Sequence, residues 1–72
     1  MKVLLVDDHP LVRQGIKSIL QTDIKFSEII EACDYEQGVS NIHNFRPDIV
    51  LVDLYMKGKN GLDLIEECKE KY

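Results

Sequence analysis

Three aspartates follow two of the most apolar segments of the sequence, and they are the residues best suited to do chemistry. Asp7 and Asp8 come directly after the apolar run 3–6, and Asp53 follows the apolar run 49–52. Ligands of open parallel sheets bind beyond the carboxyl ends of the strands, so we expect these carboxylates to lie close together at that edge. Two carboxylates about 4 Å apart repel by about 4 kcal/mol at an effective dielectric constant near 20. The three together therefore need protons or a cation.

A cluster of carboxylate oxygens suits a hard divalent cation, Mg²⁺ before Ca²⁺. Such a site also suits phosphoryl transfer, because the metal neutralises phosphoryl oxygens and a carboxylate can act as the nucleophile. Asp53 stands alone at the end of its strand, whereas Asp7 and Asp8 are paired. We therefore predict Asp53 as the nucleophile and the pair as the residues that hold the ion. The alternative is structural, since an isolated aspartate at a strand end usually serves a turn or a helix cap.

Apolar runs typical of buried parallel strands alternate with stretches of helical periodicity, which predicts the order βαβαβα. Strands are expected over residues 2–7, 26–32 and 48–53. The second strand carries Glu28 and Glu31, and it is predicted at an edge of the sheet because a central parallel strand is apolar on both faces. The third strand is apolar throughout its middle, which favours a central position.

Three helices are predicted to follow these strands. The first begins at Pro10, which suits a first helical turn. Its predicted apolar face carries Leu11, Val12, Gly15, Ile16, Ile19 and Leu20, opposite Arg13, Gln14 and Lys17. The second begins after the cap candidate Asp34 and ends before Pro47. In the third, Leu62, Ile65, Cys68 and Tyr72 follow helical spacing.

Length and composition exclude several classes of protein. A chain of 72 residues allows one small domain. Its 13 acidic and 9 basic residues give a net charge of −4, without a basic stripe that could neutralise nucleic-acid phosphates, so this segment is not expected to contact DNA. No segment is long and apolar enough to span a membrane, and the N-terminus lacks a signal peptide. With two cysteines that show no pairing pattern, this predicts a cytoplasmic protein.

The motifs around the aspartates resemble those of a known family. Residues 3–9 and 47–56, together with Gly61 at the family's usual interval after Asp53, resemble the first three βα units of a response-regulator receiver domain of bacterial two-component systems. The resemblance covers all 72 residues, and the run 7–16 is similar to the subfamily with a C-terminal helix-turn-helix output domain. It implies a flavodoxin-like α/β fold. Residues 1–72 would form a partial receiver, with the remaining βα units and the DNA-binding output domain outside this chain.

The resemblance also implies roles for the site residues. Asp53 would accept a phosphoryl group from a sensor histidine kinase and so control transcription, as a phosphoryl acceptor rather than an enzyme. Asp8 would ligate Mg²⁺ directly and Asp7 would hold its hydration shell. Asp53 and the backbone carbonyl of Tyr55 would supply further metal ligands. The family's switch residues, a hydroxyl residue on the fourth strand and a lysine on the fifth, lie in units that this chain does not include.

Other interpretations of the chain stay open. Without the switch residues, it can act as a receiver-like interaction module that is not phosphorylated. A metal-dependent phosphohydrolase is disfavoured, because such enzymes usually have a second acid two residues after the nucleophile, where this sequence has Tyr55. The family's strand order would leave the strand at 48–53 with an open edge, which predicts self-association through that edge.

Three other residues near or outside the motifs were considered as candidates. Lys57 stands where the family usually has proline, which should loosen the loop over the metal. His9 is a candidate metal ligand or phosphoryl relay by residue type. Because it precedes Pro10 at a helix start and Mg²⁺ prefers oxygen ligands, it is interpreted instead as a capping or packing residue. His43, in the second helix, is expected to face solvent.

Overall fold

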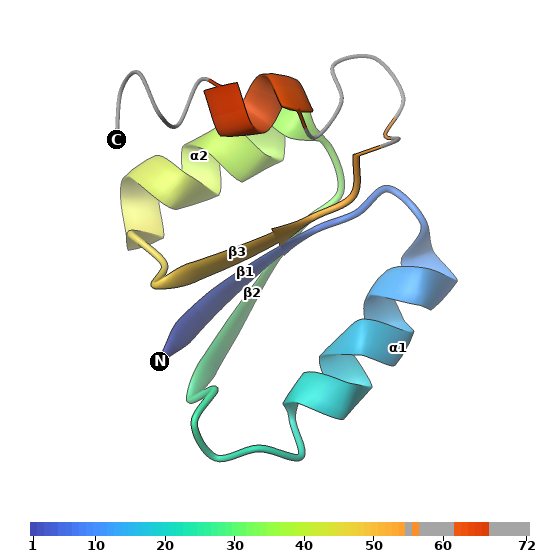
Figure 1. Cartoon of the computed structure of the whole chain (residues 1–72), viewed down its shortest axis with the longest axis vertical. Coiled ribbons are helices and arrows are strands. Elements are labelled where there is room, and N and C mark those ends of the chain that lie inside the picture. Colours follow the sequence, from blue (N-terminus) through green and yellow to red (C-terminus); the bar gives the residue numbers. More distant parts are fainter. Residues whose placement is uncertain (55, 57–61, 67–72) are drawn as a thin grey trace.

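The computed structural model describes residues 1–54, 56 and 62–66 of the chain (Figure 1). It contains a parallel three-stranded sheet with the strand order β2-β1-β3. The elements are β1 (Lys2–Val6), α1 (Pro10–Leu20), β2 (Glu28–Ala32), α2 (Tyr35–Phe45) and β3 (Ile49–Val52). Residues 62–66 are also helical. The predicted βαβαβα order is therefore confirmed over these residues.

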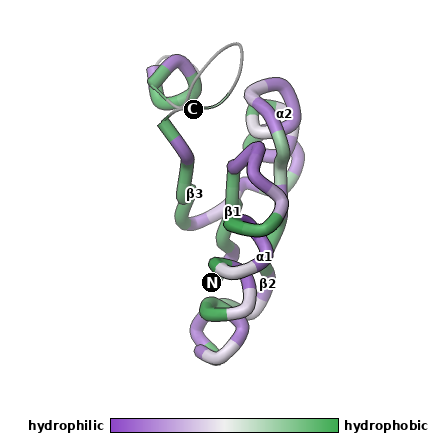
Figure 2. The backbone as a smooth tube through the Cα atoms, turned by 90° about the vertical axis from the view of Figure 1, so that its right-hand side faces the viewer, coloured by the Kyte–Doolittle hydropathy of each residue, from purple (hydrophilic) through white to green (hydrophobic). Residues whose placement is uncertain are grey.

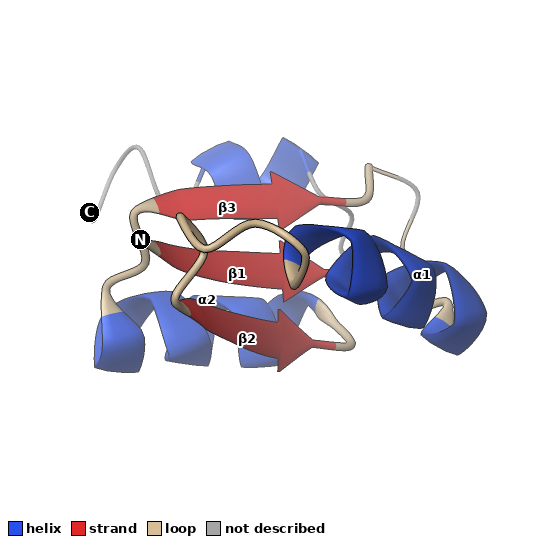
Figure 3. Ribbon diagram, turned by 90° about the horizontal axis from the view of Figure 1, so that it is seen from below, coloured by secondary structure: helices blue, strands red, loops and turns tan. Residues whose placement is uncertain are grey.

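Strand β1 is the centre of the sheet. Its residues 3–6 are buried, each at most 2% exposed, because β1 has a strand on either side (Figure 2) and helices on both faces (Figure 3). Leu4 lies opposite Ile30 of β2 and Val50 of β3. The predicted edge position of β2 is confirmed. For β3, the described residues contradict the central position that its apolar run favoured and confirm the open edge that the family's strand order predicted. There β3 pairs with β1 alone, and Val50 and Leu51 are 37% and 39% exposed.

The main core lies between the sheet and α2 together with residues 62–66. Figure 3 shows these helices on one face of the sheet and α1 on the other. Gly38 brings α2 close to the sheet, since a Cβ atom there would lie 3.1 Å from Leu64 Cδ2 and 3.4 Å from Val6 Cγ1. The buried members of this core are Leu4, Val6, Ala32, Ile42, Met56 and Leu64.

Helix α1 covers its face of the sheet only in part. Its start at Pro10 is as predicted, but none of its residues is buried, and Leu11 and Ile19 are 89% and 71% exposed. Among the elements described, α1 contacts the sheet chiefly through β1. Periodicity predicts which side of a helix is apolar but not how much sheet surface is available to cover it. The predicted apolar face is therefore only partly buried, through Ile16 and Leu20.

Helix α2 has the ends that the sequence predicts. Asp34 Oδ1 accepts a hydrogen bond from the backbone N–H of Gln37 at 2.8 Å, and Gln37 Oε1 accepts one from the backbone N–H of Cys33 at 2.9 Å. The first contact satisfies an N–H group that the first helical turn leaves without a partner, and the second satisfies the N–H group of the residue that precedes the N-cap. The helix ends at Phe45, and the C-cap residue Arg46 that follows adopts a left-handed conformation with φ of 49°.

The helical residues 62–66 pack through a residue that the spacing argument did not select. Leu64 is 1% exposed, whereas Leu62 and Ile65 are 55% and 37% exposed. Cys68 and Tyr72, which completed the predicted pattern, lie outside the described residues. Within the described part of the chain, no helix has the length and apolar character needed to cross a membrane.

Candidate functional site

Backbone hydrogen bonds fix the aspartates at the carboxyl edge of the sheet. The N–H of Asp7 donates to the carbonyl oxygen of Ala32 on β2 at 3.0 Å, and the N–H of Asp53 donates to the carbonyl oxygen of Val6 on β1 at 2.9 Å. Both bonds extend the parallel ladder by one residue beyond the strands. The acids that end β1 and β3 are therefore held side by side by the sheet itself.

The predicted convergence of the three aspartates is confirmed. Asp7, Asp8, His9 and Asp53 each place one possible ligand atom within 4.8 Å of those of the other three. The side chains of Asp7, Asp8 and Asp53 are only 7%, 17% and 20% exposed. Three partly desolvated carboxylates at this spacing form a site of strongly negative potential. Tyr55, whose carbonyl was predicted as a ligand, lies outside the described residues, as do Lys57 and Gly61.

His9 lies against this acidic cluster. Its Nδ1 atom is 3.0 Å from Asp8 Oδ1, 3.1 Å from Asp7 Oδ1 and 3.3 Å from Asp53 Oδ2. The residue occupies the N-cap position of α1, yet its side chain makes no capping hydrogen bond and is 60% exposed. Its interpretation as a capping or packing residue is therefore wrong. The sequence signal that could have indicated a role for His9 at the acidic site is its position directly after two acids. His43, by contrast, is exposed on α2, as expected.

The acids change the titration of the imidazole. The hydrogen bond from His9 to Asp7, followed by the charge of Asp8, raises the pKa of His9 above its ordinary value. A protonated imidazole is therefore an internal counter-charge for the three carboxylates when no metal is bound. The same residue's backbone N–H donates to Asp7 Oδ1 at 2.8 Å, which orients that carboxylate.

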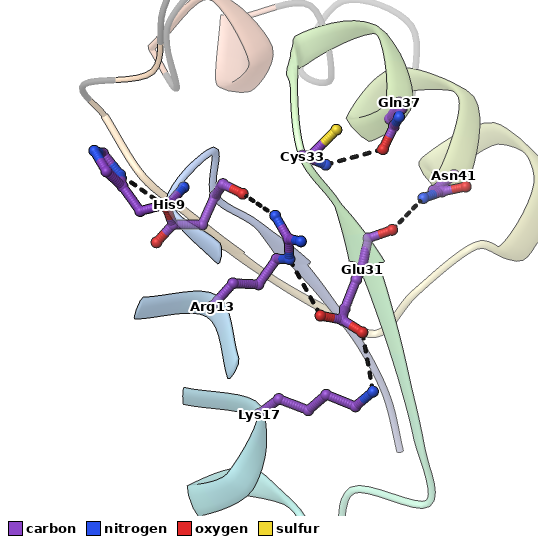
Figure 4. Close-up of polar contacts among 8 residues, drawn as sticks. His9, Arg13, Lys17, Glu31, Cys33, Gln37 and Asn41 are labelled. Carbon is purple, nitrogen blue, oxygen red and sulfur yellow. Dashed lines mark hydrogen bonds and ion pairs between the residues drawn. The ribbon is translucent and has the colours of Figure 1, made fainter. Parts of the chain in front are cut away.

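A second polar network, which sequence analysis missed, braces the end of β1 (Figure 4). Arg13 on α1 donates from Nη1 to the carbonyl oxygen of Asp7 at 2.8 Å and from Nε to Glu31 Oε1 on β2 at 3.2 Å. Lys17 donates from Nζ to Glu31 Oε2 at 2.9 Å. The sequence pattern predicts Arg13 and Lys17 on the polar face of α1 and Glu31 as a charge on an edge strand. The network instead joins α1 to the sheet, where the apolar contacts of α1 are few.

Replacing Glu31 with glutamine should weaken this brace in a pH-dependent way. The hydrogen bond from Lys17, followed by that from Arg13, lowers the pKa of Glu31. Its ionic contribution to stability is therefore present at neutral pH and is lost as the pH falls through the lowered folded-state value. We expect Glu31→Gln to reduce the free energy of unfolding by about 0.5–1 kcal/mol at neutral pH, as is typical of partly exposed ion pairs. Urea unfolding measured from neutral to acid pH should show the two proteins converging.

The matched control is Glu28→Gln, which changes an exposed glutamate at the start of the same strand. It should leave stability within about 0.5 kcal/mol of the unmodified protein. An equal loss for both variants, or a Glu31→Gln effect that does not change with pH, would contradict the ionic brace.

An apolar cavity adjoins the acidic cluster. It has a volume of about 380 Å³ and lies between β1, α1 and β3. Its apolar wall includes Leu5, Ile16 and Leu51, and Asp7, His9 and Asp53 complete the lining. The acids are therefore reached from a recess in the molecule and not only from the outer rim of the sheet.

Comparison with known proteins identifies the fold and the family. The model of the response regulator receiver domain family matches residues 3–72. The chain belongs to this family. The receiver is 41% identical over 66 residues to the nitrate/nitrite response regulator protein homolog of Haemophilus influenzae, covering 92% of this chain and 32% of that protein. It is 42% identical over 71 residues to the transcriptional regulatory protein YdfI of Bacillus subtilis, covering 99% of this chain and 33% of that protein.

Comparison with solved structures also places the chain among the response regulators. A two-component response regulator of the LuxR family from Aurantimonas sp. SI85-9A1 superimposes with a TM-score of 0.89 at 29% identity, over 96% of this chain and 49% of that one. The predicted flavodoxin-like α/β class and the predicted family are both confirmed. The names of these relatives agree with the predicted subfamily of transcriptional regulators. The receiver spans about a third of the length of the curated relatives it matches.

Proposed function

We propose that this chain is the phosphoryl-accepting part of a two-component response regulator and that Asp53 is its acceptor. The observation that carries the proposal is the placement of Asp53 at the end of β3, beside the acidic pair at the end of β1. A lone capping or turn role does not account for three carboxylates gathered from two strands at one edge. The donor in the cell would be the phosphohistidine of a sensor kinase.

The carboxylates fit the divalent cation that this function needs. Asp7, Asp8 and Asp53 supply oxygen atoms that lie close enough to share one ion, and oxygen is the donor that Mg²⁺ prefers. Asp8 would ligate it directly, Asp7 would hold its hydration shell, and Asp53 and the Tyr55 carbonyl would complete the protein ligands. When bound, Mg²⁺ would neutralise charge on the phosphoryl oxygens.

Phosphoryl transfer would then proceed at Asp53. One carboxylate oxygen forms a bond to phosphorus while the bond from phosphorus to the histidine nitrogen of the kinase breaks, and the product is an acyl phosphate on Asp53. The histidine nitrogen takes the electron pair of the broken bond, and the ring leaves as a neutral imidazole because its other nitrogen carries a proton in the reacting phosphohistidine. Arg13 holds the carbonyl group of Asp7 from the side of α1, which keeps the neighbouring acids in position during the transfer.

The names of the relatives extend the proposal from phosphoryl transfer to the control of transcription. Each of the curated relatives described is about three times as long as this chain, and their names include transcriptional regulators. We propose that phosphorylation of Asp53 controls transcription and that any contact with DNA is made by an output domain outside residues 1–72.

The intact mass of the protein after incubation with Mg²⁺ and a small-molecule phosphodonor tests this proposal. We expect an increment of one phosphoryl group. Asp53→Asn should abolish it, because an amide is a far weaker nucleophile than a carboxylate. Asp48→Asn is the matched control, since Asp48 precedes the same strand at its opposite end, and this variant should still be modified.

A second candidate function is an interaction module that is not phosphorylated. The observation that favours it is the edge of β3, where Val50 and Leu51 are partly exposed and β1 is the one strand partner among the described residues. Such an edge can pair with another strand, and the simplest product is a two-fold dimer. No mass increment in a folded protein, together with a dimer mass by light scattering, would favour this function over the first.

A further inference from the structure

We propose that His9 is a metal ligand of the acidic site and makes it selective for imidazole-binding transition ions such as Co²⁺, Ni²⁺ and Zn²⁺ over Mg²⁺. The inference rests on the proposed function, because it assigns a further ligand to the same cation site. It concerns which ion the site takes when several are present. The oxygen ligands alone do not determine which ion binds, since carboxylates bind all of these ions.

The position of the imidazole carries the argument. Nδ1 of His9 lies 3.0–3.3 Å from one carboxylate oxygen of each of Asp7, Asp8 and Asp53. Donor atoms around an ion with bonds of about 2.1 Å are separated by roughly 3–4 Å. The four candidate ligand atoms lie within 4.8 Å of one another, so small side-chain adjustments bring them to a common ion.

The chain also fixes where this imidazole can lie. The backbone N–H of His9 is hydrogen-bonded to Asp7 Oδ1 at 2.8 Å, and Pro10, which follows, begins α1. The backbone of His9 is therefore held between the end of β1 and a helix. The side chain is 60% exposed, so an ion can approach it directly from solvent.

Ligand chemistry then gives the selectivity. Neutral imidazole is a good ligand for zinc, nickel and other late first-row ions, whereas Mg²⁺ prefers carboxylate, carbonyl and water oxygens. A site of three carboxylates and one imidazole gains a bond with the first group of ions and none with Mg²⁺. His9 should therefore raise affinity for one group of ions without raising it for the other.

Titration calorimetry of the chelator-treated protein with Mg²⁺ and Co²⁺ tests the proposal, at a mildly alkaline pH because metal binding displaces protons from the ligands. We expect His9→Ala to weaken Co²⁺ binding by about 10- to 100-fold, the range found when even outer-shell partners of metal ligands are removed. The same variant should bind Mg²⁺ as well as the unmodified protein or more tightly. The visible absorption of bound Co²⁺ should change with the loss of the nitrogen ligand.

Two matched variants locate the effect. His43→Ala removes the histidine of α2, which is exposed and distant in sequence from the acids, and should leave the binding of both ions and the Co²⁺ spectrum unchanged. Asp8→Ala should weaken the binding of both ions. Circular dichroism of each variant establishes that it is folded.

Two results would overturn the inference, and they differ in what they say about the proposed function. If Mg²⁺ binds and requires Asp8, but His9→Ala leaves the ratio of Co²⁺ to Mg²⁺ affinity unchanged, His9 is not a ligand and the cation site stands. If neither ion binds the folded protein, the cation site itself is wrong and the assignment of His9 falls with it.

Discussion

Replacing Leu4 with alanine should remove about half of the stability of the 72-residue chain. Leu4 is fully buried on the central strand and belongs to the core beneath α2. Large-to-small changes of a buried leucine cost about 2–5 kcal/mol, because the transfer free energy of the lost atoms and the energy of the cavity add. At roughly 0.05–0.15 kcal/mol per residue, a domain of this size has a total stability of only about 4–11 kcal/mol. Urea unfolding followed by circular dichroism measures the loss.

Leu11→Ala is the matched control for this prediction. It makes the same chemical change on α1, at a side chain that is 89% exposed, and it should change the free energy of unfolding by no more than about 0.5 kcal/mol. Equal losses at the two positions would mean that α1 is packed far more closely than the structure shows. A loss below about 1 kcal/mol at Leu4 would mean that β1 is not the centre of the core.

The order of the elements could be predicted from the sequence because each depends on a local pattern. Pro10 marks the start of α1 and Asp34 caps α2, and neither feature requires knowledge of the rest of the fold. The edge position of β2 could also be predicted, from the charges of Glu28 and Glu31. The apolar run of β3 did not give its position, because such a run indicates that a strand can be buried but does not show how many neighbours it has. The open edge of β3 followed instead from the strand order that the family resemblance implied.

Packing and side-chain direction were harder to predict than the elements. The apolar stripe of α1 was identified correctly as a pattern, yet Leu11 and Ile19 are largely exposed, while Arg13 reaches the sheet through hydrogen bonds. Leu64 was missed as a core residue because Leu62 and Ile65 fitted the spacing equally well. The choice between such alternatives is made by contacts with Val6 and Gly38, which are distant in sequence.

At the acidic site, too, the positions of residues could be predicted better than the directions of their side chains. Asp7, Asp8 and Asp53 could be predicted together because strand ends of a parallel sheet meet at one edge, and this argument needs only the strand order. The orientation of His9 could not be predicted, since it depends on the rotation of one side chain over carboxylates that come from two strands. The preference of Mg²⁺ for oxygen ligands indicates the aspartates but gives no reason to expect an imidazole beside them.

Replacing Asp8 with alanine should abolish Mg²⁺ binding without harming the fold. Asp8 supplies a carboxylate oxygen that is shielded from water and lies within reach of the ligand atoms of Asp7 and Asp53. Mg²⁺ dehydrates reluctantly and depends on one or two carboxylates for its attachment to protein. Removing Asp8 also relieves repulsion among the three acids, so the metal-free variant should be at least as stable as the unmodified protein.

Stability measured with and without Mg²⁺ separates these two effects. A ligand at 100 times its dissociation constant raises the free energy of unfolding by about 2.7 kcal/mol, so the unmodified protein should gain this amount and Asp8→Ala should gain nothing at the same concentration. Asp23→Ala changes an exposed aspartate in the connection between α1 and β2 and should keep the full gain. Retention of the gain in Asp8→Ala would show that the ion binds elsewhere. Asp53 would then lack its metal partner, and the phosphoryl-acceptor site would have to be reassigned.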